Sequence, residues 1–213
     1  MAESMAESMA DESTVERGTE VDGELEDLAQ GVADQVASFL LAVRELAHRG
    51  QAATAAPLLL LEVSQLLLAG ARLGVMTDLV PTDEYEAEAG PDPDLDRIRE
   101  ELAELLGPAD EYVEVFDPYA EPPELVRGRI SDDVSAIAER LAHGLAHHRA
   151  GRVGEALWWW QFSYVSSWGA EASGVLRALQ AIVAHDRFDE ERPATIEMEW
   201  IAAADELEPT SES

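Results

Sequence analysis

Apolar residues recur at spacings of three and four along much of the chain, which is the period of one face of an α-helix. The first such pattern starts at Glu24 and ends in a basic turn closed by Gly50, which is typical of a helix C-terminus. A second begins around Pro57, in the first turns, where a missing N–H costs least. The short connection predicts that helices over 24–49 and 52–73 form an antiparallel pair, and the wide apolar face of the second predicts a central place in the bundle.

A second helical block follows the middle of the chain. Ser131 is a suitable N-cap with acids in the first turn, and the helix it opens is expected to end near Arg149. Another helix starts near Val153. A third, or a kinked continuation, runs from about Gly169 to His185, and the small residues around its start favour close helix contacts or a bend.

Between the two blocks lies an acidic stretch rich in Pro and Gly, which we interpret as a linker at about 77–124. Within it, Asp94 can cap a short helix that ends at Gly107. A short strand is possible at 111–116, and the alternating pattern of 195–201 is also strand-like. These two segments could pair as a small ribbon, although facing glutamates oppose that pairing.

A tryptophan-rich stretch at 141–185 holds four of the five tryptophans and four of the five histidines. Successive helical residues lie about 100° apart, so the three consecutive tryptophans point in three directions. One face is expected to be core and carries Trp158, Phe162, Val165, Ala172, Leu176, Leu179 and Val183. The other carries Trp160, Tyr164, Ser167 and Glu171.

That second face has two interpretations. If the N-terminal helices leave it uncovered, it forms an aromatic groove for a partner helix or an apolar ligand, with candidate partner-binding residues Trp160, Tyr164, Trp159 and Trp168. If both faces are buried in one bundle, the stretch is simply core, and this alternative is favoured because buried aromatics usually form core.

The amino-acid composition excludes several classes of catalytic and metal site. The chain has no Cys, no Lys and no Asn, which excludes thiol nucleophiles, thiolate metal sites, Schiff-base lysines and P-loop lysines. The sequence shows no nucleophile elbow and no glycine-rich phosphate loop. No cofactor is expected.

The formal charge of −31 is unevenly distributed. Residues 1–30, 82–124 and 186–213 hold 36 of the 45 acids, whereas 31–75 and 125–185 are nearly neutral. Such a chain is repelled by nucleic-acid phosphates and anionic lipids, so neither partner is expected. No window approaches a charge-free membrane span, and the acidic N-terminus lacks the features of a signal peptide, which predicts a cytoplasmic protein.

These patterns predict an all-α fold, a helical bundle of antiparallel hairpins with a possible minor two-stranded ribbon. We expect a disordered acidic tail over 1–23, a single helical domain over 24–186 that contains the acidic linker at about 77–124, and an acidic C-terminal tail over 187–213.

One group of side chains has the spacing of metal ligands. Glu139, His143 and His147 are four apart, which stacks them on one helix face and could place two imidazoles and a carboxylate on one metal ion. At about 100° per residue, these three side chains lie opposite the apolar stripe of their helix. The competing interpretation is therefore a solvent-exposed face. The sequence contains no HExxH motif to reinforce them.

The segment DEYVEVFDPYAEPPELVRGRISDDVSAIAERLAHGL, followed by HRAGRVGEALWWWQFSYVSSWGAEASGVLRALQAIVAH, resembles a family of actinobacterial proteins known as a domain of unknown function. The resemblance covers roughly 28–185 and is most specific in WWWQFSY and SWG. It implies a helical fold and no assigned activity, substrate or catalytic residues.

The predicted function is a non-catalytic cytoplasmic protein-interaction module, whose acidic segments would steer a basic partner. One alternative is a metal-dependent enzyme that uses the Glu139, His143 and His147 cluster. The other is an acidic mimic of nucleic acid. The oligomeric state is left open.

Overall fold

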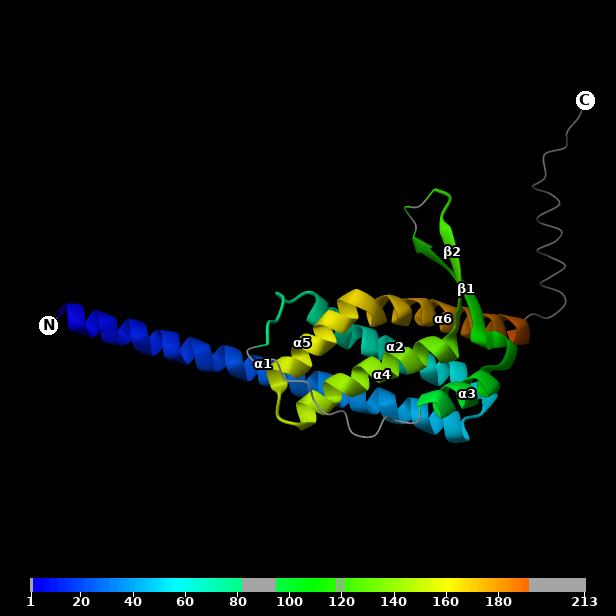
Figure 1. Cartoon of the computed structure of the whole chain (residues 1–213), viewed down its shortest axis with the longest axis horizontal. Helices are drawn as coiled ribbons and strands as arrows, with labels where there is room; N and C mark the ends of the chain where they lie inside the picture. The colour runs from blue at the N-terminus through cyan, green and yellow to red at the C-terminus, as the bar shows by residue number, and fades with distance from the viewer. Residues whose placement is uncertain (1, 82–94, 118, 120, 192–213) are drawn as a thin grey trace, which may run out of the picture.

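The computed structural model describes residues 2–81, 95–117, 119 and 121–191, with side chains described from Gly23 to Arg187 apart from 116 and 117. Its helices pack as antiparallel neighbours, and one β-hairpin stands out from them (Figure 1). The fold is therefore all-α with a minor two-stranded ribbon, as the sequence pattern predicted.

The first two helices form the predicted hairpin. Helix α1 spans Ala2–Arg49 and α2 spans Ala52–Gly74, joined by a turn in which the Gly50 N–H donates to the Leu46 carbonyl at 2.8 Å. Because α1 begins at Ala2, it starts upstream of the predicted position at Glu24. The division of the chain into tails and a domain stays a prediction.

The stretch expected to be a linker contains regular structure. Helix α3 (Leu95–Leu106) confirms the predicted short helix, and a 3₁₀ turn (Gly107–Asp110) leads into strand β1 (Glu111–Asp117). Strand β1 pairs antiparallel with β2 (Glu124–Arg129), in a register that sets Tyr112 opposite Gly128. The strand predicted at 111–116 is confirmed, but its partner is 124–129. The expected partner, 195–201, lies outside the described residues.

The second helical block follows the prediction except at its start, where Arg129 is the N-cap and the predicted cap, Ser131, lies inside the helix. Helix α4 spans Ile130–Arg149, and α5 spans Val153–Ser163. A π-helical turn (Tyr164–Trp168) joins α5 without a break to α6 (Gly169–Glu191). The expected kinked continuation is thus a π-helical turn, in which the Gly169 N–H donates to the carbonyl of Tyr164, five residues back.

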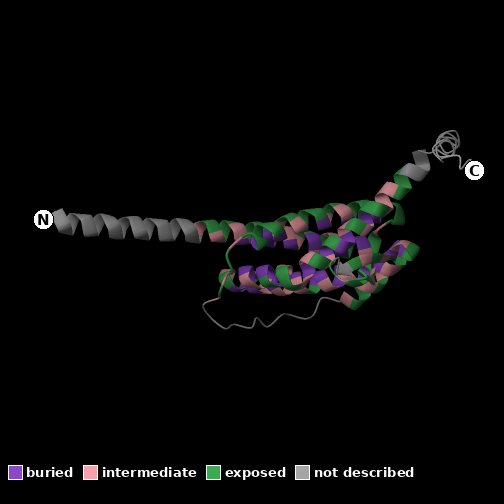
Figure 2. Cartoon of the chain, turned by 90° about the horizontal axis from the view of Figure 1, so that it is seen from above, coloured by how far each residue is buried: buried purple, intermediate pink, exposed green. Residues whose placement is uncertain are grey.

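The core lies where these helices face one another, and Figure 2 shows buried residues along the inner sides of the helices. Helix α4 packs on α1, α3, α5 and α6, while α2 packs on α1 and α6. The largest fully buried side chains come from every helix of the body: Phe39, Leu59, Leu66, Leu73, Leu102, Ile130, Ile137, Leu141, Leu157, Trp160, Trp168 and Leu179.

Two tryptophans set how closely the helices approach. Trp160 is fully buried, and its indole nitrogen lies only 2.2 Å from where a Cβ on Gly144 would be. The ring of Trp168 lies 2.4 Å from the corresponding position on Gly70. Since nothing larger than a glycine fits at either point, α4 and α2 can contact the indole rings directly with their backbones.

We therefore expect Gly144→Ala to lower the free energy of unfolding by about 1–3 kcal/mol, because the new methyl group overlaps the Trp160 ring. Gly154→Ala in α5 is the matched control. No atom lies within 4 Å of its Cβ position, so the substitution is expected to be neutral or to stabilise by about 0.4–1 kcal/mol. Urea unfolding followed by circular dichroism measures both, and equal stabilities for the two variants would contradict this packing argument.

Candidate functional site

The structure places two of the four predicted partner-binding residues in the core. Trp160 is 0% exposed and Trp168 is 1% exposed, so neither lies on a surface that a partner can reach. The Trp160 Nε1–H donates to the Leu141 carbonyl at 3.2 Å. Of the two interpretations, the exposed groove built on Trp160 is wrong, because α4 and its glycine cover the ring, as the favoured core interpretation expected for this residue.

The other two predicted residues are half-buried. Trp159 donates its Nε1–H to the Arg140 carbonyl at 2.8 Å. Tyr164 packs edge-on against Trp168 with ring centroids 4.7 Å apart. Tyr164 also lines a shallow groove of about 530 Å³ beside the C-terminus of α2, together with Val75 and Val165. A contact between a partner and Tyr164 or Trp159 stays a prediction.

The face expected to be core is exposed in its first half. Phe162 is 54% exposed and Val165 is 72% exposed, while Trp158 is half-buried and stacks on Phe162 at 5.5 Å. The second half of that face follows the prediction, since Ala172 and Leu179 are fully buried.

The π-helical turn explains this reversal. In an unbroken α-helix, residues seven apart share a face, so Ala172 would share its face with Val165 and Trp158. A π-helical turn inserts an extra residue and shifts everything before it by about one position. The buried face then runs from Ala172 back through Trp168 to Trp160.

The predicted metal cluster is only partly assembled. Glu139 is exposed, His143 is half-buried and His147 is 4% exposed, which corrects the expectation that all three face solvent. Glu139 and His143 line one shallow cleft of about 390 Å³ with Trp159 and Phe162, and His147 is absent from that lining.

The two histidines contact each other. Their Nε2 atoms lie 3.2 Å apart, and the His143 ring packs on Trp159 with centroids 4.2 Å apart. Burial lowers the pKa of His147, and the neighbouring His143 lowers it further, which favours the neutral imidazole. Within the described residues, no three His, Asp or Glu side chains are arranged to hold a metal ion.

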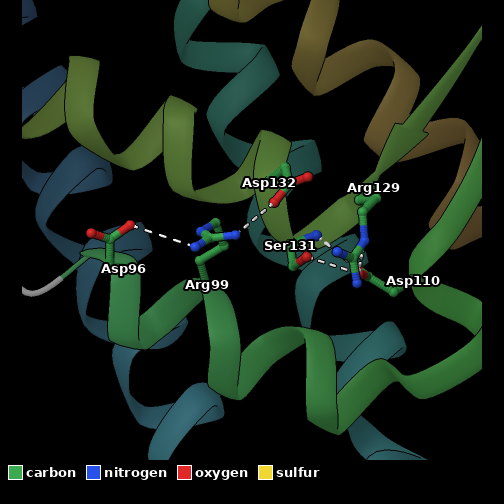
Figure 3. Close-up of polar contacts among 6 residues, drawn as sticks. All are labelled: Asp96, Arg99, Asp110, Arg129, Ser131 and Asp132. Carbon is green, nitrogen blue, oxygen red and sulfur yellow. Dashed lines mark hydrogen bonds and ion pairs between the residues drawn. The ribbon is translucent and has the colours of Figure 1, made fainter.

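The hairpin is anchored to the helices by polar contacts that the sequence did not reveal. The Asp110 carboxylate is fully buried and accepts hydrogen bonds from the Ser131 N–H and hydroxyl, both at 2.8 Å. It also accepts one from Arg129 Nε–H at 3.1 Å (Figure 3). Asp110 therefore fixes the start of α4 to the base of the hairpin, which is a structural role.

Beside this anchor, several acids surround one tyrosine. The Tyr112 hydroxyl donates to Asp133 Oδ2 at 2.8 Å, and Glu114 lies against the backbone of Gly174 in α6. Burial raises the pKa of Asp133, Glu114 and Glu171, and the Asp133 charge raises those of Glu114 and Glu171 further. Arg140 opposes the shift at Glu171, which it contacts at 3.1 Å. Burial and Asp133 likewise raise the pKa of Tyr112.

A further surface is formed by the outer side of α2, opposite its buried face. The exposed fractions are 46% for Leu58, 51% for Leu61, 65% for Leu68 and 86% for Val75. We call this surface the outer seam of α2 and define it as Leu58, Leu61, Gln65, Leu68, Arg72 and Val75, all of them exposed. The expectation that α2 is central to the bundle is wrong on this side, where the four apolar side chains are exposed. The side chain of Gln35 in α1 reaches the edge of the seam and donates to Gln65 Oε1 at 3.2 Å.

The spacing of the outer seam is that of a coiled-coil helix. Its positions alternate in steps of three and four, with Leu61, Leu68 and Val75 seven apart. The heptad was visible in the sequence, but α2 has apolar residues on both sides. Only the packing of the other helices shows which side stays open.

By length and composition, α2 is also the one described helix that is apolar enough to cross a membrane, although core helices of soluble proteins meet the same criterion. This corrects the expectation that no segment approaches a membrane span. Only 28% of its most apolar window is buried, which agrees with the open outer seam.

The acids around Tyr112 generate a pH prediction. A carboxyl whose pKa is raised on folding adds stability below its ordinary pKa, here 3.8 or 4.5, and loses it as the pH rises through the folded value. We expect these carboxyls to increase the free energy of unfolding as the pH falls from 7 toward about 4.5, against an opposite contribution from His147, whose pKa is lowered. Asp133→Asn should reduce the carboxyl contribution.

Urea titrations at several pH values measure the effect. Glu100→Gln in α3 is the control, since it removes the same charge at an exposed position and should leave the pH dependence unchanged. An Asp133→Asn profile parallel to that of the wild type would refute the role of this cluster.

Comparisons with known proteins agree with this architecture. The crystal structure of protein BF1032 from Bacteroides fragilis superposes with a TM-score of 0.58 at 18% identity, covering 71% of this chain and 89% of that one. At this identity, the likeness shows a shared fold. Among the curated proteins, none matches the chain. Residues 23–185 match the family described as "Domain of unknown function (DUF5063)". This range includes the hairpin and at least part of every described helix. The chain belongs to this family of unknown function.

Proposed function

We propose that this protein is a non-catalytic interaction module that binds a helix along the outer seam of α2. The observation that carries the proposal is a row of exposed apolar side chains at heptad spacing on a rigid helix. From Leu58 to Val75 the seam is about 25 Å long, at about 1.5 Å per residue. An amphipathic helix that carries a matching apolar stripe fits such a surface.

The remaining polar groups support a non-catalytic function. Asp110, Asp133 and Tyr112 hold the hairpin on the helices, and His143 contacts His147 and Trp159. These contacts give each of the named side chains a structural role. The metal-dependent alternative has no observation in its favour among the described residues.

The net charge of the chain indicates which classes of partner the module favours. A formal charge of −31 disfavours nucleic acid and anionic membranes as partners and would attract a basic protein by long-range steering. We propose a cytoplasmic location, because so acidic a chain is repelled by anionic membrane surfaces. An acidic mimic of nucleic acid would use the acids directly and would not need the outer seam.

The proposal predicts position-specific crosslinking. A photoreactive phenylalanine analogue in place of Leu68 should form a covalent adduct in the native cell, because the bound helix covers this position. The same analogue in place of Leu125, which is 67% exposed on the hairpin, is the matched control and should form none. Mass spectrometry identifies the crosslinked segment. An absence of adduct at position 68, or the same adduct at both positions, would refute helix binding at the seam.

A further inference from the structure

The outer seam of α2 is complementary to itself when one copy is reversed. Numbered as a coiled coil, Leu58, Gln65 and Arg72 occupy a positions and Leu61, Leu68 and Val75 occupy d positions. In antiparallel pairing, each a residue meets a d residue of the other helix. The pairs 58 with 75, 65 with 68 and 72 with 61 belong to one antiparallel register, so all three layers form together.

The layers of that register are chemically reasonable. Leu58 meets Val75 of the second copy, Gln65 meets Leu68, and Arg72 meets Leu61. The two-fold axis repeats each contact. The stem of Arg72 can cover a leucine while its guanidinium stays in water. A parallel pair would instead place Arg72 against Arg72, and like charges oppose that arrangement.

The charge distribution points to the same surface. Residues 52–75 carry one acid and one arginine, in a chain whose formal charge is −31. A contact between two copies through the acidic segments would bring like charges together, whereas the outer seam brings mostly uncharged side chains together. The helix side opposite the seam is already held by the bundle through Leu59, Val63 and Leu66, so the seam is fixed before association.

We infer that the helix bound by the outer seam is α2 of a second copy of this chain, in an antiparallel two-fold dimer. This inference rests on the helix binding of the proposed function and names a second copy, instead of a basic protein, as the partner. The dimer has a distinctive salt dependence. Because the two copies repel each other, added salt should strengthen the dimer, whereas it would weaken the binding of a basic partner.

Sedimentation equilibrium of the full chain at low and high salt tests the inference. The wild type is expected at twice the 23.2 kDa chain mass, with a dissociation constant that falls as salt is added. Leu68→Glu places two carboxylates beside the two-fold axis and should raise this constant about tenfold or more. Leu68 is 65% exposed in the single chain, and circular dichroism confirms that the fold is kept. Leu125→Glu on the hairpin adds the same charge at a similarly exposed position and should remain dimeric.

Disulfide trapping tests the register, and the absence of native cysteine makes it specific. A mixture of chains carrying Leu58→Cys with chains carrying Val75→Cys should form a mixed disulfide. Either variant alone should form none, since its two sulfurs would lie about 25 Å apart. A disulfide between two Leu58→Cys chains would show parallel pairing and overturn the register.

The outcomes separate this inference from the proposed function. A monomer at every salt concentration, combined with an adduct of another protein at position 68, overturns the second copy as partner and leaves helix binding intact. A dimer that Leu68→Glu and Leu125→Glu affect equally overturns the seam as its interface. A monomer that co-sediments with lipid vesicles through Leu68 overturns both.

Discussion

Direct contact between tryptophan rings and helix backbones is the constraint on which the rest of this structure depends. Trp160 meets α4 at Gly144, and Trp168 meets α2 at Gly70, so two large side chains bring three helical segments to close distances. The Trp160 indole N–H is satisfied by the Leu141 carbonyl, which allows a polar group to be fully buried. The orientation of the last helical segment therefore follows from where these two rings fit.

The π-helical turn at Tyr164–Trp168 allows both rings to face the core. Without the extra residue, burying Trp160 would turn Ala172 and Leu179 away from the bundle. With it, the side chains before and after the turn are buried on one side, and Phe162 and Val165 are left in solvent. The cost of an irregular turn is offset by the apolar surface it buries, at about 25 cal/mol per Å².

The surface divides into parts with different physical character. Half-buried acids surround the base of the hairpin, where Asp133 accepts a hydrogen bond from Tyr112. The outer seam of α2 is almost uncharged and apolar. In a strongly negative protein, a row of apolar side chains with one charge is a place where association costs little, and this contrast is the physical basis of the proposed binding role.

The sequence alone determined the helical class and most helix ends. The periodicity near Val36 and Ile137, together with turn residues such as Gly50 and Gly151, expresses local preferences that tertiary packing leaves unchanged. The short helix before Gly107 and the strand after it were also predictable for this reason.

Tertiary structure decided what each face meets. Trp160 is buried and Phe162 is exposed because the extra residue of the π-helical turn rotates the helix face that precedes it. Strand β1 pairs with the nearer segment, 124–129. The outer side of α2 is exposed because the other described helices pack on its opposite side. Local periodicity records that a helix has an apolar face, but only the packing of the other helices determines whether that face is buried.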